Sequence, residues 1–289
     1  MIELFGQESC GKSTTCYHAM AEAQRKFPDK FVALIDSEMS NDNSYASALG
    51  VKVEELVVSQ PDSGQDAFAI IQGLIETGAC SLIVVDSVAA LVPREETEED
   101  DYGKSMVGVQ ARMMSKSLRK LSPIAARYGT TIIFTNQQRT KIGVMYGDPS
   151  TTSGGNALKY YDSIRIKLSK IGTVDEGTGD DKEKVAVRIK AETVKNKVFP
   201  PFKKSEFVIS FGKGIDNEAS VIEGIVEKGI VTKKGAWISY NGENIAQGMT
   251  KFKELLANNK ELYEEMKKKL EDTLKGNSVT VVKEEKIDA

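Results

Sequence analysis

Short apolar runs alternate with longer amphipathic segments over the first half of the chain. Buried strands are predicted at 2–5, 31–36, 56–58, 81–86 and 130–135. Helices are predicted between them, over about 12–26, 65–77 and 107–127. Strands rich in Ile and Val that alternate with helices of ten or more residues are typical of a mostly parallel sheet covered on both faces. The pattern therefore predicts an α/β fold.

The pattern becomes more β-like after residue 160. Strands are predicted at 163–168, 185–195 and 206–211, with the polar residues 173–184 as a hairpin or loop between the first two. Beyond these strands come short elements and turns, and then a charged helix over about 250–275. The last dozen residues lack periodicity and are expected to fray. We therefore expect a core of residues 1–211 and a small α+β domain of residues 212–289.

Composition excludes several classes of protein. Of the 289 residues, 40% are hydrophobic and 28% are charged, and no apolar run approaches the roughly 20 residues that span a bilayer. No secretory signal is visible, and three cysteines (Cys10, Cys16 and Cys80) without metal-ligand spacing indicate reduced thiols. We therefore expect a cytoplasmic protein with no membrane partner. The only histidine, His18, falls in a predicted helix, which argues against His-based metal sites and Ser-His-Asp catalysis.

A phosphate-binding motif lies almost at the first residue. Residues 6–13, GQESCGKS, match GxxxxGK[ST], with a predicted strand before them and a predicted helix after them. Glycines let successive backbone N–H groups converge on phosphate oxygens, and the helix N-terminus adds partial positive charge. Lys12 is predicted to reach the β- and γ-phosphates, and Ser13 to bind Mg²⁺. A chance match in a glycine-bearing turn is the weaker alternative, because both flanking elements are in place.

Three further carboxylates lie at or just after the carboxyl ends of predicted strands, where ligands of α/β sheets collect. Asp86 ends the run SLIVVD and is predicted to help hold the metal, although it could instead cap the next turn. Asp36 and Glu38 follow the run FVALID, and Glu38 is a candidate base that activates water. From these residues alone, two solvated loop acids are an equally good interpretation of Asp36 and Glu38.

One stretch of the chain is basic although the chain as a whole is acidic. Residues 105–147 contain seven basic residues and no acidic one, in a chain of net charge −3. Arg112, Lys116, Arg119 and Lys120 recur at spacings of three or four, so they share one helix face. A row of cations suits a phosphate backbone. A solvated helix face is the alternative.

Five blocks make the comparison with a known family specific. They are VVDSVAALVP (84–93), QARMMSKSLRKL (110–121), NQQRTKIGVMYGDP (136–149), TTSGGNALKYY (151–161) and VKNK (194–197). In this order and spacing the chain resembles the bacterial and phage RecA recombinases from residue 1 to about 275. The resemblance implies an ATPase that forms filaments on single-stranded DNA and pairs it with homologous duplex DNA during repair. It also implies a self-cleaving SOS repressor as a partner.

The resemblance assigns roles around the nucleotide. It implies contacts with ATP at Gly6, Glu8, Ser9, Cys10, Gly11, Lys12, Ser13, Thr14, Asp42 and Tyr45. It strengthens the assignment of Glu38 as the residue that activates water. It also makes Gln137 a sensor of the γ-phosphate that transmits the presence of this phosphate to the DNA loop. Lys195 and Lys197 match lysines that reach ATP on the neighbouring subunit, so catalysis is expected at a subunit boundary.

The resemblance also assigns a DNA site. It implies DNA contacts at Arg112, Ser115, Arg119, Arg139, Ile142, Gly154, Gly155 and Asn156. Residues 98–107 and 138–153 align with two loops that line the filament axis, with Val107 and Ile142 as apolar wedges between base triplets. The first loop departs from the family, because residues 95–104, EETEEDDYGK, are strongly acidic. The family's segment before the P-loop strand is also missing, so we expect weakened filament assembly.

Two other classes of function remain open. One is a nucleotide-gated DNA-binding or regulatory module that has lost self-assembly. The other is a relative with the same core, such as a hexameric helicase or a circadian-clock ATPase, against which the GGNALKYY and KNK blocks argue. Hydrolysis of ATP stimulated by single-stranded DNA separates the recombinase from the regulatory module.

Overall fold

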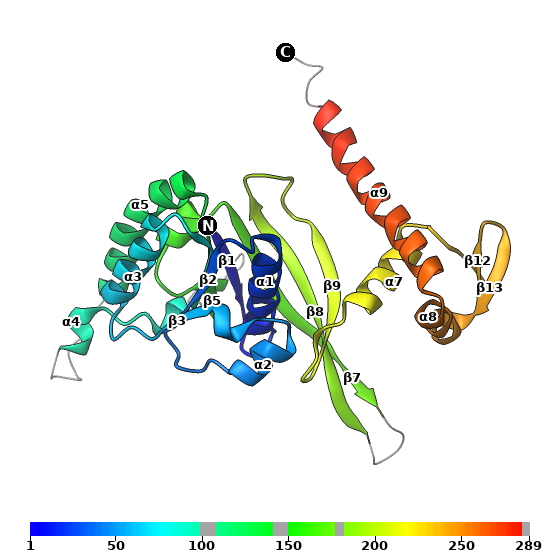
Figure 1. Cartoon of the computed structure of the whole chain (residues 1–289), viewed down its shortest axis with the longest axis horizontal. Coiled ribbons are helices and arrows are strands. Elements are labelled where there is room, and N and C mark those ends of the chain that lie inside the picture. Colours follow the sequence, from blue (N-terminus) through cyan, green and yellow to red (C-terminus); the bar gives the residue numbers. More distant parts are fainter. Residues whose placement is uncertain (99–107, 141–149, 177–181, 285–289) are drawn as a thin grey trace. The chain divides into compact units, whose positions relative to one another are not determined.

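A ten-stranded sheet forms the larger part of the molecule (Figure 1). The computed structural model describes residues 1–98, 108–140, 150–176 and 182–284. The strand order is β10-β9-β8-β7-β1-β5-β4-β2-β3, with β6 paired to β5. Pairs among β7, β1, β5, β4, β2 and β3 are parallel, whereas β8, β9 and β10 continue the sheet in antiparallel fashion. The predicted mostly parallel sheet is confirmed.

The bounds of the elements in this part of the chain are as follows. The strands are β1 (Ile2–Gly6), β2 (Phe31–Asp36), β3 (Leu56–Ser59), β4 (Cys80–Asp86), β5 (Thr131–Thr140), β6 (Ser150–Thr152), β7 (Ile164–Glu176), β8 (Glu183–Asn196), β9 (Lys204–Ser210) and β10 (Gly214–Ile215). The helices are α1 (Lys12–Lys26), α2 (Asn43–Ala48), η1 (Val53–Glu55), α3 (Gly64–Glu76), η2 (Val88–Ala90), α4 (Arg94–Thr97), α5 (Val109–Tyr128) and α6 (Ala157–Tyr161).

The continuous apolar strands are explained by burial on both faces of the sheet. Along β2, Val32 and Leu34 pack in one cluster with residues of α1, such as Met20. The alternate residues Ala33 and Ile35 pack in a second cluster with residues of α3 and α5. Successive strand side chains point to opposite faces, so a strand covered by helices on both sides is apolar throughout.

Several elements extend beyond their predicted ends. Strand β5 runs to Thr140 rather than 135, because its last residues pair with β6. Strands β7 and β8 pair antiparallel out to Glu176 and Glu183, so the hairpin predicted as one alternative for residues 173–184 is confirmed at its described strand ends. Polar residues are tolerated there because most of these side chains are at least partly exposed.

The chain divides into two compact units, Met1–Ile215 and Asp216–Ala289, a boundary four residues beyond the predicted one. The second unit contains α7 (Asn217–Glu227), β11 (Thr232–Lys234), β12 (Trp237–Tyr240), β13 (Glu243–Gln247), α8 (Gly248–Asn258) and α9 (Lys260–Glu284). Its own core includes Ile225, Ile238, Phe252 and Met266.

The C-terminal helix prediction is wrong in two respects. The single helix predicted over about 250–275 is two helices, α8 and α9, separated at Asn259. The carboxamide of Asn259 accepts a hydrogen bond from the Leu262 N–H (3.1 Å), as a residue preceding a helix does. Helix α9 then continues to Glu284, into residues that were expected to fray. No helix of the described residues is both long and apolar enough to span a membrane.

Candidate nucleotide and DNA site

The carboxyl ends of β1, β2, β4 and β5 meet at one edge of the sheet, which is where parallel α/β sheets bind ligands. The loop between β1 and α1 packs tightly there. Gly11 has a φ of 80°, and a Cβ at this position would lie 2.2 Å from Cδ1 of Ile209. A Cβ on Gly6 would lie 2.3 Å from the carbonyl oxygen of Leu168. Both positions therefore require glycine, and the loop leads directly into the N-terminus of α1, a favourable place for a phosphate.

Lys12 and Cys10 lie on this loop. The Lys12 Nζ donates a hydrogen bond to the carbonyl oxygen of Gln7 (2.9 Å), so the side chain folds back across the loop. Cys10 is 1% exposed, and burial raises the pKa of its thiol. Its side chain therefore belongs to the core. If Cys10 contacts a phosphate as predicted, it does so through its backbone N–H group.

The predicted metal ligands are in direct contact. The Ser13 hydroxyl donates to Oδ2 of Asp86 (2.8 Å), and Oδ1 of Asp86 accepts a hydrogen bond from the Thr135 hydroxyl (2.6 Å). Thr135 comes from the neighbouring strand β5 and is fully buried. It fixes the orientation of the Asp86 carboxylate, a role that sequence reasoning missed. The only sequence signal was a threonine at the carboxyl end of an apolar run.

The two acids after β2 have different surroundings. Glu38 is exposed, and its carboxylate accepts a hydrogen bond from the Ser87 hydroxyl, next to Asp86. Asp36 is 2% exposed and accepts hydrogen bonds from the N–H groups of Ser40 (3.1 Å) and Asn41 (3.2 Å). The interpretation of Asp36 as a solvated acid is therefore wrong. It orders the loop that carries Glu38.

The predicted adenine contacts lie beside α1. The Tyr45 hydroxyl and the Thr14 hydroxyl share a hydrogen bond of 3.0 Å. Asp42 caps α2 by accepting a hydrogen bond from the Tyr45 N–H (2.9 Å). Tyr17, which was not predicted, stacks edge-to-face on Tyr45 with ring centroids 5.9 Å apart. Tyr45 is therefore held by two neighbours and by the cap of its own helix.

A cavity of about 250 Å³ collects most of the predicted nucleotide residues. It is lined by Glu8, Ser9, Cys10, Gly11, Lys12, Ser13, Thr14, Glu38, Asp86 and Gln137. These residues come from four segments that are far apart in the sequence. Gly6, Asp42, Tyr45, Lys195 and Lys197 are not among the lining residues.

Comparison with known proteins agrees with this geometry. A family model described as the RecA N-terminal domain matches residues 1–216, and one described as the RecA C-terminal domain matches residues 219–275. The chain belongs to the RecA family. Protein RecA of Nostoc punctiforme is 46% identical over 279 residues, which cover 96% of this chain and 76% of that relative. Protein RecA of Mycobacteroides abscessus is 47% identical over 274 residues, which cover 95% and 77%.

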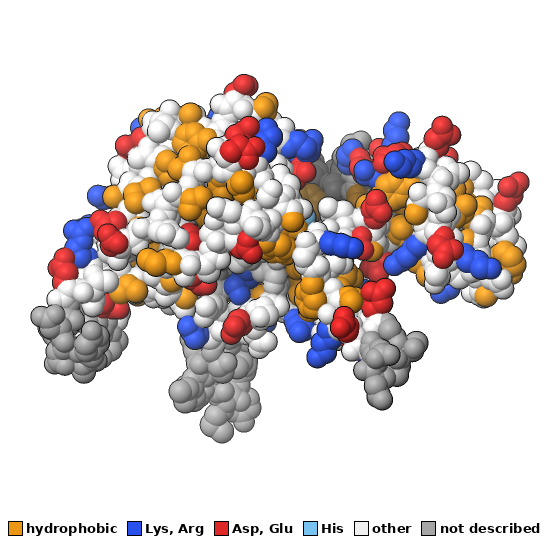
Figure 2. Space-filling view, turned by 60° about the horizontal axis from the view of Figure 1, so that its bottom comes forward, with side chains coloured by type: hydrophobic (Ala, Val, Ile, Leu, Met, Phe, Trp, Pro, Cys, Tyr) orange, Lys and Arg blue, Asp and Glu red, His pale blue; other side chains and the backbone are white. Residues whose placement is uncertain are grey.

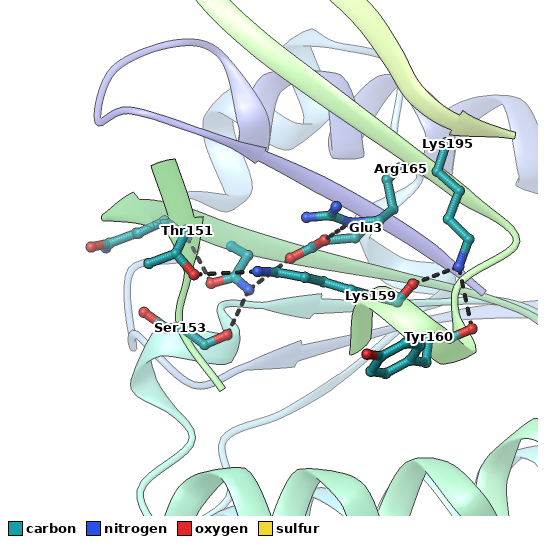
Figure 3. A network of polar contacts seen from close by, with 9 residues as sticks. Glu3, Thr151, Ser153, Lys159, Tyr160, Arg165 and Lys195 are labelled. Atoms are coloured by element: carbon teal, nitrogen blue, oxygen red, sulfur yellow. Dashed lines mark hydrogen bonds and ion pairs between the residues drawn. The ribbon is translucent and has the colours of Figure 1, made fainter. Parts of the chain in front are cut away.

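The lysines expected to act across a RecA subunit boundary lie near the other edge of the sheet, at the end of α6. The Lys195 Nζ donates to the carbonyl oxygens of Lys159 (2.5 Å) and Tyr160 (3.2 Å), as Figure 3 shows. The Lys197 Nζ donates to the same carbonyl of Tyr160 (3.3 Å). Cations are stabilised at helix C-termini. In this chain alone, therefore, neither lysine lines the nucleotide cavity.

The residues expected to bind DNA in RecA proteins lie on α5, β5 and the start of α6. Arg112 and Arg119 are exposed on α5, with Ser115 half-buried between them. Arg112, Lys116 and Lys120 also line a cavity of about 610 Å³ that α5 shares with α3. Over the face drawn in Figure 2, Lys and Arg side chains are interspersed with Asp and Glu.

A glycine turn precedes α6. Gly154 and Gly155 have φ values of 81° and 76°, and a Cβ on Gly155 would lie 2.8 Å from Cβ of Ala111 on α5. Asn156 follows as the N-cap residue of α6. Arg139 is exposed on β5, whereas Val107 and Ile142 lie outside the described residues. The DNA contacts of these residues stay predictions.

Proposed function

We propose that the chain is an ATP-dependent DNA recombinase. In this proposal it binds single-stranded DNA as a filament, hydrolyses ATP and promotes homologous pairing and strand exchange. The supporting observation is the cavity at the sheet edge, where Lys12, Ser13, Glu38, Asp86 and Gln137 come together. Membership of the RecA family supports the DNA-directed part of the proposal.

The roles of the side chains follow from their positions. Lys12 leaves the Gln7 carbonyl and binds the phosphates, where its charge offsets the charge that develops during transfer. Glu38 accepts a proton from the attacking water at its exposed carboxylate, while Ser87 holds that carboxylate in place. Gln137 lines the same cavity and contacts the end of the phosphate chain.

The residues present fit Mg²⁺. The Ser13 hydroxyl and the Asp86 carboxylate are hard oxygen donors only 2.8 Å apart, and Mg²⁺ prefers such donors together with water and phosphate oxygens. These two residues would hold the ion, with Thr135 orienting Asp86. When bound, the ion neutralises charge on the phosphates.

Glu38→Gln tests this assignment, because it keeps the size of the side chain and removes the base. ATP hydrolysis stimulated by a single-stranded oligonucleotide should fall about 100-fold or more. The affinity for ATP should stay within about threefold, since the phosphate loop is unchanged. Glu54→Gln, at an exposed acid of η1, is the matched control and should behave like the unaltered chain.

Equal losses of ATP binding and hydrolysis in Glu38→Gln would show that Glu38 is structural. If the unaltered chain binds ATP and DNA but single-stranded DNA never stimulates hydrolysis, the regulatory module is the better description. Measuring both quantities on the same preparations separates these outcomes.

A further inference from the structure

None of the described residues that line the nucleotide cavity is aromatic. The lining comes from the phosphate loop, the first turn of α1, the loop after β2, and strands β4 and β5. A cavity of about 250 Å³ with such polar walls suits phosphates and a hard cation. A nucleobase stacks best on an aromatic face, so it needs a surface outside this cavity.

Tyr45 of α2 supplies an aromatic surface next to the cavity. Its hydroxyl shares a hydrogen bond of 3.0 Å with the hydroxyl of Thr14, which is one of the lining residues. Tyr45 is half-buried, so it is not sealed inside the core. When phosphates lie at the N-terminus of α1, the base of the same nucleotide is therefore expected to stack against Tyr45.

Tyr17 of α1 contacts this ring from the core side. Tyr17 is 6% exposed, and its ring meets the Tyr45 ring edge to face, with centroids 5.9 Å apart and planes at 87°. This is a favoured geometry for an aromatic pair. Tyr17 follows Thr14 by three residues, so the two side chains share one face of α1. Thr14 therefore fixes the hydroxyl end of Tyr45, and Tyr17 fixes its ring.

The Tyr17 hydroxyl also orders the loop before α2. It donates to Oδ1 of Asn41 (3.1 Å) and accepts a hydrogen bond from the Asp42 N–H (3.4 Å). Asp42 is the residue that caps α2, through the Tyr45 N–H. Burial raises the pKa of the Tyr17 hydroxyl, so the hydroxyl stays protonated and is able to donate. One side chain thus holds both the Tyr45 ring and the start of the helix that carries it.

We propose that Tyr17 is the positioning residue that makes nucleotide binding depend on the base. This inference rests on the proposed function. With Tyr17 in place, the Tyr45 ring is oriented before the nucleotide arrives, so stacking the base needs little further ordering of α2. Tyr17 is not among the residues that line the cavity, so it acts through Tyr45 and leaves the phosphates alone.

The test compares ATP with inorganic tripolyphosphate, which has the phosphates but no base. The Kd of each would be measured calorimetrically with Mg²⁺. Tyr17→Leu keeps an apolar side chain in the core and removes both the ring and the hydroxyl. It should weaken ATP binding about tenfold and tripolyphosphate binding less than about twofold. Tyr17→Phe keeps the ring and removes only the two hydrogen bonds, so ATP binding should weaken about threefold.

Steady-state hydrolysis gives a second readout. Both variants should raise the KM for ATP by the same factors as the Kd and keep kcat within about twofold of the unaltered chain, as loss of uniform binding does. The reason is that Asp36 still holds the loop that carries Glu38, through the N–H groups of Ser40 and Asn41. A merely structural role would instead lower kcat and weaken both ligands together.

Tyr240 is the matched control. This tyrosine of the second unit is 8% exposed, and its hydroxyl also makes two hydrogen bonds, to Glu265 (2.6 Å) and from Lys269 (2.5 Å). Tyr240→Leu should lower the melting temperature yet leave the affinities for ATP and tripolyphosphate unchanged. A selective loss of ATP affinity in Tyr240→Leu as large as in Tyr17→Leu would overturn the inference, because general destabilisation would then explain both.

The remaining outcomes separate the two proposals. If the unaltered chain does not bind ATP, the proposed function fails before Tyr17 is tested. If it binds ATP no more tightly than tripolyphosphate, the base contributes nothing and the inference is wrong. Unchanged ATP affinity in Tyr17→Leu, or equal losses for both ligands, would also contradict it. Should Tyr17→Leu fail to fold, Tyr17→Phe decides, and it must show the selective loss of ATP affinity.

Discussion

Two buried aspartates at opposite ends of the parallel strands have contrasting surroundings. Asp36 lies at the carboxyl ends, here called the nucleotide edge, and Asp162 lies at the amino ends, here called the α6 edge. Asp36, after β2, accepts hydrogen bonds from two backbone N–H groups and from the Gln60 Nε2 (2.9 Å). Asp162, just before β7, is fully buried, and neither of its carboxylate oxygens has a hydrogen-bond partner among the described residues. Burial, reinforced by the charge of Glu3, raises the pKa of Asp162 to about 8. The Asp36 carboxylate is thus stabilised by hydrogen bonds, whereas the burial of the Asp162 carboxylate costs free energy.

The lysines at the two edges also differ in what they contact. At the nucleotide edge, Lys12 lines the cavity together with Glu38 and Asp86. At the α6 edge, Lys195 and Lys197 donate to backbone carbonyls, and burial lowers the pKa of Lys195. The nucleotide edge is thus organised within one chain. Lys195 and Lys197 are not among the residues that line the cavity of their own chain, which is compatible with the hypothesis that they serve a neighbour.

The largest expected effect comes from the nucleotide edge. Lys12→Ala should reduce ATP hydrolysis about a thousandfold, because it removes the charge placed against the phosphates. Fluorescent nucleotide binding and steady-state hydrolysis would measure it. Lys26→Ala, in the last turn of the same helix and exposed, is the control. Turnover at the unaltered rate in Lys12→Ala would contradict the assignment of the loop.

The second effect concerns the α6 edge. The double variant Lys195→Ala/Lys197→Ala should lose about 100-fold in DNA-stimulated hydrolysis, since charge clamps of this type contribute that much or more. ATP binding to dilute, isolated chains should be unchanged. Lys203→Ala, an exposed lysine just before β9, is the control.

Mixing the Lys12→Ala variant with the Lys195→Ala/Lys197→Ala variant tests whether the lysines act on a neighbouring subunit. Lys12→Ala keeps both lysines, and the double variant keeps the phosphate loop. In an equal mixture, about a quarter of head-to-tail interfaces combine the intact loop of one chain with the intact lysines of the other. Two inactive preparations should therefore regain hydrolysis when mixed. Failure to recover, with both variants still binding DNA, would place the lysines in a role within their own chain.

Features that are local in sequence could be predicted. The glycine loop, its flanking strand and its helix lie within 26 consecutive residues, and both ends of α1 were predicted correctly. The apolar strands could be predicted because burial on two faces leaves a continuous run. The carboxyl ends of parallel strands share an edge, so the strand pattern by itself places Asp86 and Glu38 beside the loop.

Features that depend on distant pairing could not be predicted. Glu3 meets Asn136 and Arg165 across strands that are separated by more than 130 residues in the chain. Thr135 orients Asp86 in the same way, through strand register. One signal was present, since a glutamate inside the apolar run IELF requires a buried partner. The sequence does not show which of its many cations supplies that partner.

The smallest effects are on stability, and they should have opposite signs at the two edges. Asp36→Asn replaces an acceptor by a donor against N–H groups, so it should destabilise the chain by about 1–3 kcal/mol. Asp162→Asn removes a buried carboxylate that lacks a hydrogen-bond partner within the described structure, so it should stabilise the chain at neutral and alkaline pH. Thermal melting of the two variants and the unaltered chain would show the contrast directly.

The pH dependence distinguishes this explanation from a simple packing effect. The pKa of Asp162 is raised to about 8 from an ordinary value of 3.8, so between these values the folded chain holds a proton that the unfolded chain has released. Its contribution to stability therefore falls as pH rises through this window and levels off above pH 8. The advantage of Asp162→Asn should be near zero at pH 4 and grow to several degrees in melting temperature by pH 8. An advantage that is the same at both pH values would mean that the Asp162 carboxylate finds a partner when it ionises.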